Sequence, residues 1–73
     1  MNDNELLNII ALNIKVERTI KKLTQAKLAE IVGVHEKYIG LIESGKQNIT
    51  IKTLNKIANC LNVDVDKLFK IKN

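Results

Sequence analysis

The sequence predicts an all-α fold, a compact domain of five helices, on three observations. Apolar residues recur at intervals of three and four along most of the chain, which is the spacing of one buried face of an α-helix. A residue that can cap a helix stands before most of these segments, and Gly or Asn follows several of them. The chain has 73 residues and no proline, so one small domain accommodates it.

The first helix is expected from about Asn4 to Lys22, with Asp3 or Asn4 as its cap. One stripe at helical spacing faces the core and consists of Leu7, Ile10, Ala11, Ile14 and Arg18. A second apolar stripe on nearly the opposite face consists of Ile9, Val16 and Ile20.

The second helix is expected over residues 25–32, with Thr24 as its cap and Gly33 as its left-handed end. A third helix is expected over residues 36–44, ended by Gly45. A turn of three or four residues that contains glycine sets two helices at about 90–120°, which is the geometry of a helix-turn-helix. The residues expected to face the core from these two helices are Leu28, Ala29, Val32, Ile39 and Ile42.

Two more helices complete the expected fold. Thr50 is placed to cap the fourth helix, Asn62 to end it, and Asp64 to cap the fifth. The expected spans are 51–61 and 65–69, followed by a solvated tail at 70–73.

Composition limits the class of protein. The formal charge is +4, which suits a polyanionic partner, and Arg18 is the single arginine among 12 basic residues. Phosphate contacts would therefore depend on lysines, amides and backbone N–H groups. The acidic start MNDNELLN is unlike a secretory signal, and no apolar run approaches the roughly 20 residues of a membrane span, so we expect a cytoplasmic protein.

Catalytic and metal-binding patterns are missing from the sequence. Cys60 is the single cysteine, so it allows neither an internal disulfide nor a cysteine-based metal site. No paired carboxylates and no phosphate-cradling glycine loop occur, and His35 has no nucleophile or metal partner beside it. We therefore expect no enzyme, no cofactor and no metal.

Four motifs occur in order along the chain: TQAKLA at 24–29, the turn glycine Gly33, YIGLIESG at 38–45 and KIANCLNV at 56–63. Together they resemble the xenobiotic-response-element family of helix-turn-helix regulators, the group that contains lambda repressor and Cro. The resemblance covers roughly residues 14–69. The run YIGLIESGKQNITIKTL is more specifically similar to controller proteins of restriction–modification systems.

The resemblance implies a lambda-repressor-like domain that regulates transcription by binding double-stranded DNA, as a homodimer on two-fold related half-sites. It implies that bases are contacted by Glu36, Lys37, Gly40 and Leu41. It implies that phosphates are contacted by Thr24, Gln25, Tyr38, Lys46, Gln47 and Asn48. It further implies a structural ion pair between Arg18 and Glu43, and apolarity suggests a dimer interface at Val65, Leu68 and Phe69.

The chain also departs from the family pattern. His35 stands where Ser, Thr or Asp usually caps the third helix, and Glu17 stands where an apolar residue is common. Controller proteins often have arginine around Glu36, Ser44 and Gln47, and this chain has none there. The operator of a controller protein therefore cannot be transferred to this chain.

A second hypothesis stays open from the sequence. The same fold serves as a protein-interaction module, such as an antitoxin or an anti-repressor. The outer stripe of Ile9, Val16 and Ile20 would then be the partner surface, because exposed apolar patches mark interaction sites.

Overall fold

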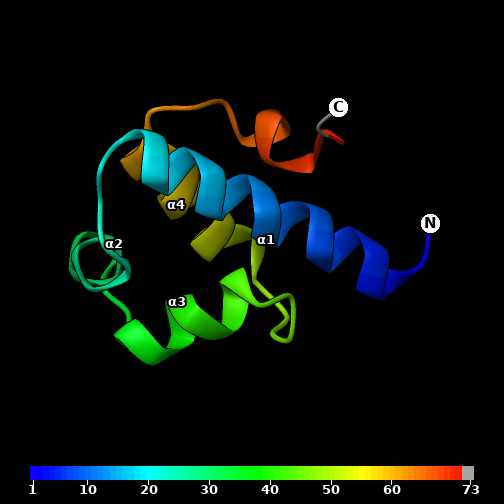
Figure 1. Cartoon of the computed structure of the whole chain (residues 1–73), viewed down its shortest axis with the longest axis horizontal. Helices are drawn as coiled ribbons and strands as arrows, with labels where there is room; N and C mark the ends of the chain where they lie inside the picture. The colour runs from blue at the N-terminus through cyan, green and yellow to red at the C-terminus, as the bar shows by residue number, and fades with distance from the viewer. Residues whose placement is uncertain (72–73) are drawn as a thin grey trace.

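The computed structural model describes residues 1–71, and the last two residues of the expected tail lie outside this range. Within it the chain forms four α-helices, a short 3₁₀ helix and no strand, which confirms the predicted all-α class (Figure 1). The elements are α1 (Asp3–Ile20), α2 (Gln25–Val32), α3 (Glu36–Glu43), α4 (Ile51–Leu61) and η1 (Val65–Phe69).

The start of α1 differs from the prediction, since Asn2 is the cap rather than Asp3 or Asn4. The Asn2 side chain accepts a hydrogen bond from the Glu5 backbone N–H at 2.8 Å. The Glu5 carboxylate accepts one from the Asn2 N–H at 3.3 Å, so the two residues form a capping box. This reciprocal pair satisfies two N–H groups, which is why the helix begins one residue earlier than expected.

The end of α1 also differs, because the helix stops at Ile20 and not at Lys22. Lys22 has φ of 59°, in the left-handed region, so it cannot continue a right-handed helix. The Leu23 N–H then donates to the Arg18 carbonyl at 3.0 Å, which closes the final turn. A lysine gives no sequence signal for a left-handed position, which explains the error.

Glycine ends both helices of the helix-turn-helix as expected. Gly33 has φ of 86° after α2, and Gly45 has φ of 75° after α3. The expected third helix is one residue too long, because Ser44 is already the residue that flanks its end. A Cβ at Gly45 would collide with the side-chain amide of Asn8 on α1, whereas a Cβ at Gly33 would meet no atom within 4 Å.

The core contains apolar residues from every element. Its fully buried side chains include Ile14, Leu28, Ile39, Leu54, Ile57, Leu61 and Leu68. Leu68 is 0% exposed, so its predicted place in a dimer interface is wrong. Its side chain fills the core of its own chain, because η1 packs on both α1 and α4.

The last element is held by contacts other than the predicted cap. The Asp64 side chain makes no capping hydrogen bond. Instead its backbone carbonyl accepts from the Lys67 N–H at 3.0 Å, the short turn typical of a 3₁₀ helix.

Asn13 attaches this C-terminal segment to α1. Its buried amide nitrogen donates to the carbonyls of Leu68 at 2.8 Å and Lys70 at 2.7 Å. Glu17, one turn further along α1, is also buried, and its carboxylate lies 3.6 Å from the Lys67 ammonium. The expected solvated tail is therefore anchored through the backbone of residue 70.

Figure 1 shows the resulting arrangement, with α1 between α3 on one side and η1 on the other. Both neighbours pack directly on α1. The first helix therefore supports the helix-turn-helix and the C-terminal segment at the same time.

Candidate nucleic-acid interface

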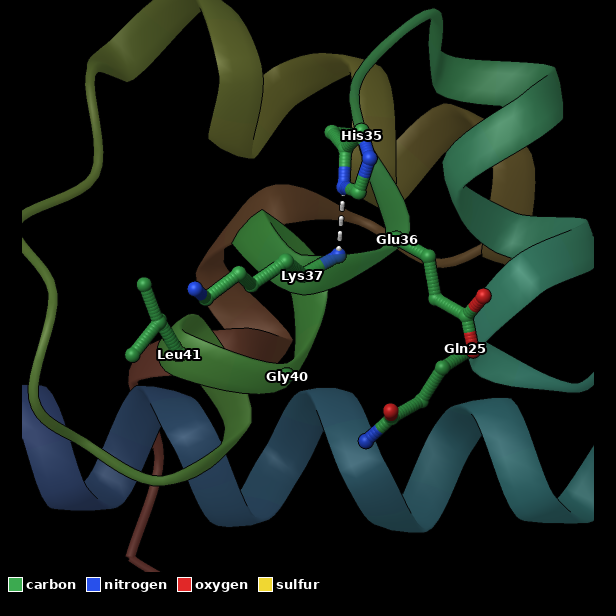
Figure 2. Close-up of a pocket in the computed structure, with 6 residues that line it drawn as sticks. All are labelled: Gln25, His35, Glu36, Lys37, Gly40 and Leu41. Carbon is green, nitrogen blue, oxygen red and sulfur yellow. Dashed lines mark hydrogen bonds between the residues drawn. The ribbon is translucent and has the colours of Figure 1, made fainter.

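One face of α3 is buried in the core, and this burial turns the opposite face toward solvent. Ile39 and Ile42 are buried in the core, which fixes the rotation of the helix about its axis. The side chains of Glu36, Lys37 and Leu41 are consequently exposed. All four residues predicted to contact bases border one hollow of about 420 Å³ (Figure 2), lined by Gln25, His35, Glu36, Lys37, Gly40 and Leu41.

His35 caps α3 despite its departure from the usual cap residues. Its Nδ1 atom accepts a hydrogen bond from the Lys37 backbone N–H at 3.0 Å, as Figure 2 shows. In this contact the Nδ1 lone pair takes the place of the hydroxyl or carboxylate oxygen of a usual cap residue. The imidazole therefore orders the first turn of the helix that exposes Lys37.

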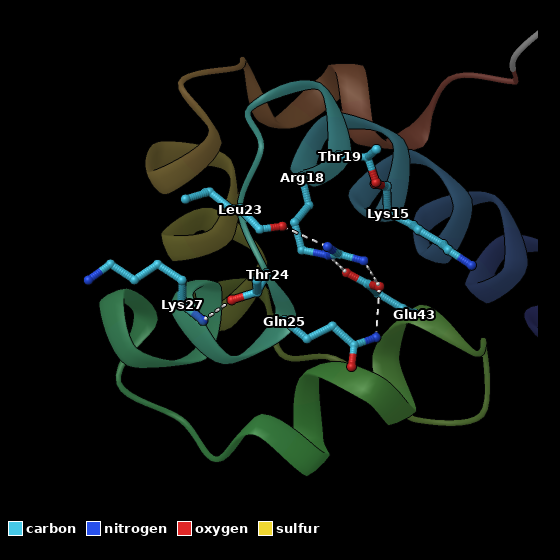
Figure 3. Close-up of polar contacts among 8 residues, drawn as sticks. All are labelled: Lys15, Arg18, Thr19, Leu23, Thr24, Gln25, Lys27 and Glu43. Carbon is cyan, nitrogen blue, oxygen red and sulfur yellow. Dashed lines mark hydrogen bonds and ion pairs between the residues drawn. The ribbon is translucent and has the colours of Figure 1, made fainter.

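The predicted ion pair between Arg18 and Glu43 is present and joins α1 to the end of α3 (Figure 3). The Nε atom lies 2.6 Å from Oε2, and Nη2 lies 3.0 Å from Oε1, so the contact is bidentate. The remaining nitrogen donates to the Leu23 carbonyl at 2.7 Å. The side chains are only 13% and 3% exposed, and the hydrogen bond to Glu43 raises the pKa of Arg18.

Gln25 is linked to the same carboxylate. Its amide nitrogen donates to Oε1 of Glu43 at 3.1 Å, as the dashed line in Figure 3 shows. Its amide oxygen points the other way, toward α3, where a Cβ placed on Gly40 would lie 3.6 Å from it. Sequence reasoning placed Gln25 near phosphate and missed the link to Glu43, since the two residues are 18 positions apart.

The other residues predicted to contact phosphate lie before α2, within α3 and in the loop after α3. Thr24 is exposed, and its hydroxyl oxygen accepts from the Lys27 N–H at 3.0 Å, which leaves the hydroxyl hydrogen free to donate. Tyr38 is half-buried and packs against the core. In the loop after α3, Lys46 and Asn48 are exposed and Gln47 is half-buried.

No group of three or more His, Cys, Asp or Glu side chains within residues 1–71 could hold a metal ion. Among the same residues, no helix combines the length and the apolarity needed to cross a membrane. Cys60 is half-buried on α4, and burial raises the pKa of its thiol.

Comparison with known proteins identifies the family. The model of the helix-turn-helix family matches residues 14–68, which is most of the chain. The chain belongs to the helix-turn-helix family. The predicted resemblance to the xenobiotic-response-element type is thereby confirmed, and α2 and α3 are the two helices of the helix-turn-helix.

Two relatives of this helix-turn-helix chain are controller proteins. Control protein C.SmaI of Serratia marcescens is 42% identical over 64 residues, which cover 88% of this chain and 76% of that protein. The crystal structure of the restriction–modification controller protein C.AhdI from Aeromonas hydrophila has a TM-score of 0.83 and 30% identity. That match covers 86% of this chain and 96% of the other.

A third relative was solved with DNA. SinR of Bacillus subtilis, the master regulator for biofilm formation, has been crystallised in complex with DNA. That structure matches with a TM-score of 0.79 and 35% identity, over 84% of this chain and 98% of the other. This helix-turn-helix chain is therefore similar in fold and sequence to a protein seen on DNA.

Proposed function

We propose that the chain is a transcriptional regulator that binds specific sequences of double-stranded DNA. The observation that carries the proposal is the exposed face of α3, held outward by the buried Ile39 and Ile42 in a chain of the helix-turn-helix family. The similarity to SinR, crystallised with DNA, supports the same function.

In the proposed complex α3 lies in the major groove and α2 crosses the backbone. Lys37, in the first turn of α3, donates to guanine O6 and N7. Glu36 accepts from cytosine N4, and Leu41 provides an apolar contact for a thymine methyl group. Gly40 has no side chain, so the DNA can approach the helix closely at that point.

A second group of residues holds the phosphate backbone without reading sequence. The first N–H groups of α2, beginning at Gln25, have no partner within the helix and favour an anion there. The proposed phosphate-binding side chains are Thr24, Tyr38, Lys46, Gln47 and Asn48.

The proposed assembly is a two-fold homodimer. Val65 and Phe69 are each 38% exposed on η1 and provide the apolar surface, whereas Leu68 takes no part. Two copies of α3 would then reach half-sites about 34 Å apart, one turn of the DNA helix.

A controller role is the more specific part of the proposal. The relatives C.SmaI and C.AhdI carry that description, and the second is a restriction–modification controller. We propose that this chain likewise regulates a restriction–modification operon, including its own promoter. Binding to the DNA upstream of its own gene, compared with unrelated DNA at the same salt concentration, tests this role.

One experiment distinguishes residues that contact bases from residues that contact phosphate. Fragments selected from a random DNA pool define the preferred sequence of the wild-type chain. Lys37→Ala should cost about 1–3 kcal/mol per half-site and relax the preference at one base pair. Lys46→Ala should weaken binding to all sequences alike and lower the salt slope by about 1 for each phosphate that the lysine no longer neutralises. An unchanged base preference in Lys37→Ala would show that this face of α3 does not read bases.

The protein-interaction module remains the second candidate. Ile20 is 61% exposed and Leu12, also on α1, is 51% exposed, so apolar surface is available for a partner. The predicted stripe is narrower than expected, however, because Ile9 and Val16 are half-buried. Salt-sensitive binding to DNA supports the regulator, while a tight protein complex without DNA affinity supports the module.

A further inference from the structure

The exposed face of α3 has a gap at its centre. Gly40 has no side chain, and the wall of the hollow beside it is formed by Gln25 of α2 (Figure 2). A base edge that approaches the exposed face of α3 beside Gly40 therefore meets the Gln25 amide.

The orientation of that amide is fixed by Glu43. A carboxylate can only accept hydrogen bonds, so the Gln25 atom 3.1 Å from its Oε1 must be the amide nitrogen. Glu43 is itself held by two hydrogen bonds from Arg18 and is 3% exposed, so it cannot turn away. Rotating the amide by half a turn would place its oxygen against a buried carboxylate, which is repulsive.

The oxygen of Gln25 is consequently the atom turned toward α3 and the gap (Figure 3). An amide oxygen is an acceptor and cannot bind a phosphate oxygen, which is also an acceptor. In the major groove it matches the amino groups of adenine N6 and cytosine N4, and it opposes the keto oxygens of guanine and thymine.

We propose that Gln25 determines specificity by accepting a hydrogen bond from an adenine or cytosine amino group through the gap at Gly40. Glu43 is the positioning residue that keeps the acceptor outward. The inference rests on the proposed DNA-binding function and replaces the phosphate contact expected of this side chain. Each half-site then contains one position at which amino bases are preferred over keto bases on the same strand.

The first experiment compares the sequences selected from a random DNA pool by wild type and by Gln25→Met, which keeps the length of the side chain without the amide. Wild type should show the amino-base position, and Gln25→Met should lose a preference of about threefold to tenfold there. The preference at the Lys37 position should persist. Asn59→Met, an exposed amide on α4, is the matched control and should select the wild-type sequence.

The second experiment removes the amino group from the DNA instead. In the selected site, the adenine is replaced by purine, or the cytosine by 2-pyrimidinone, which removes the amino donor from the groove together with its hydrogen bond in the base pair. The weakened base pair affects both proteins, so the loss of affinity on this site should be about threefold to tenfold larger for wild type than for Gln25→Met.

Three results would overturn the inference. Equal weakening on all sequences in Gln25→Met, with its base preference intact, would indicate a phosphate contact. If wild type and Gln25→Met lost the same affinity when the amino group is removed from the DNA, another residue would contact that base. If wild type selects no sequence at all, the proposed function fails as well, whereas the other two outcomes leave that function standing.

Discussion

At the scale of single residues, the pair of Arg18 and Glu43 carries the largest expected effect. Both side chains are nearly buried, and every nitrogen and oxygen that the pair buries has a partner within residues 1–71. Removal of one partner leaves an uncompensated charge, so Arg18→Ala should lower the free energy of unfolding by about 3–5 kcal/mol. Urea denaturation followed by circular dichroism measures this change.

The control for this prediction is Lys27→Ala. Lys27 pairs with Glu30 at 2.8 Å, but both side chains are more than half exposed, so solvent screens their attraction. We expect no resolvable change in that variant. An Arg18→Ala chain as stable as Lys27→Ala would contradict the assigned burial of the pair.

Cys60 supports a prediction about pH. Burial raises the pKa of its thiol, so the folded chain holds the proton more tightly than the unfolded chain does. The contribution to stability is therefore complete below the unfolded pKa of about 8.5 and is lost as the pH rises through the folded pKa. The difference in unfolding free energy between wild type and Cys60→Ser should stay constant below the unfolded pKa and fall as the pH rises from the unfolded to the folded pKa of the thiol. A difference that is flat at all pH values would refute the effect of burial.

At the scale of elements, the two glycine helix ends can be compared directly. Gly33→Ala adds only the strain of a left-handed alanine, about 1–2 kcal/mol, because nothing lies within 4 Å of the new Cβ. Gly45→Ala adds the same strain and must also displace the Asn8 amide on α1. The melting temperature of Gly45→Ala should therefore be lower than that of Gly33→Ala.

The extra cost of Gly45→Ala should disappear in an Asn8→Ala background. The four melting curves of that double-mutant cycle isolate the contact between α1 and the end of α3. A full extra cost that persists without the Asn8 amide would place the strain in the backbone instead.

Elements with local signals could be predicted from the sequence. Thr24, Gly33 and Thr50 act within three or four residues of themselves, so α2 and α4 were predicted with the observed bounds. Sequence patterns did not predict contacts between residues that are far apart in the sequence. Asn13 holds carbonyls 55 and 57 positions away, and nothing in a window around it reveals that partner.

The same limit applies to the candidate site. Its exposed residues on α3 follow from the position of Ile39 and Ile42, which periodicity shows. The orientation of the Gln25 amide depends on Glu43, and it became apparent only when α2 and the end of α3 were placed together. Leu68 was misassigned because an element of five residues is too short to reveal its inward face.

At the scale of the whole molecule, assembly is the property to test. Val65→Glu places a charge on the exposed surface of η1, next to its copy across the proposed two-fold axis. We expect the dimer to dissociate at micromolar concentration in sedimentation, and affinity for a two-half-site operator to fall to that for a single half-site. The cause is that two like charges would have to be desolvated against each other.

Ile51→Glu is the matched control for assembly. Ile51 is 75% exposed at the start of α4, so the same substitution adds a charge outside the proposed interface. This variant should sediment as wild type does. Equal sedimentation of both variants would remove η1 from the interface.

The anchoring of η1 to α1 also has a consequence for synthesis on the ribosome. The chain emerges from its N-terminus, at about 5–20 residues per second. Both helices of the helix-turn-helix are then outside while Leu68 and the two carbonyls that bind Asn13 are still to come. Until those residues emerge, the apolar surface of α1 that η1 covers and the side-chain amide of Asn13 are exposed to solvent. The nascent chain should therefore complete this domain only after Leu68 has left the ribosome.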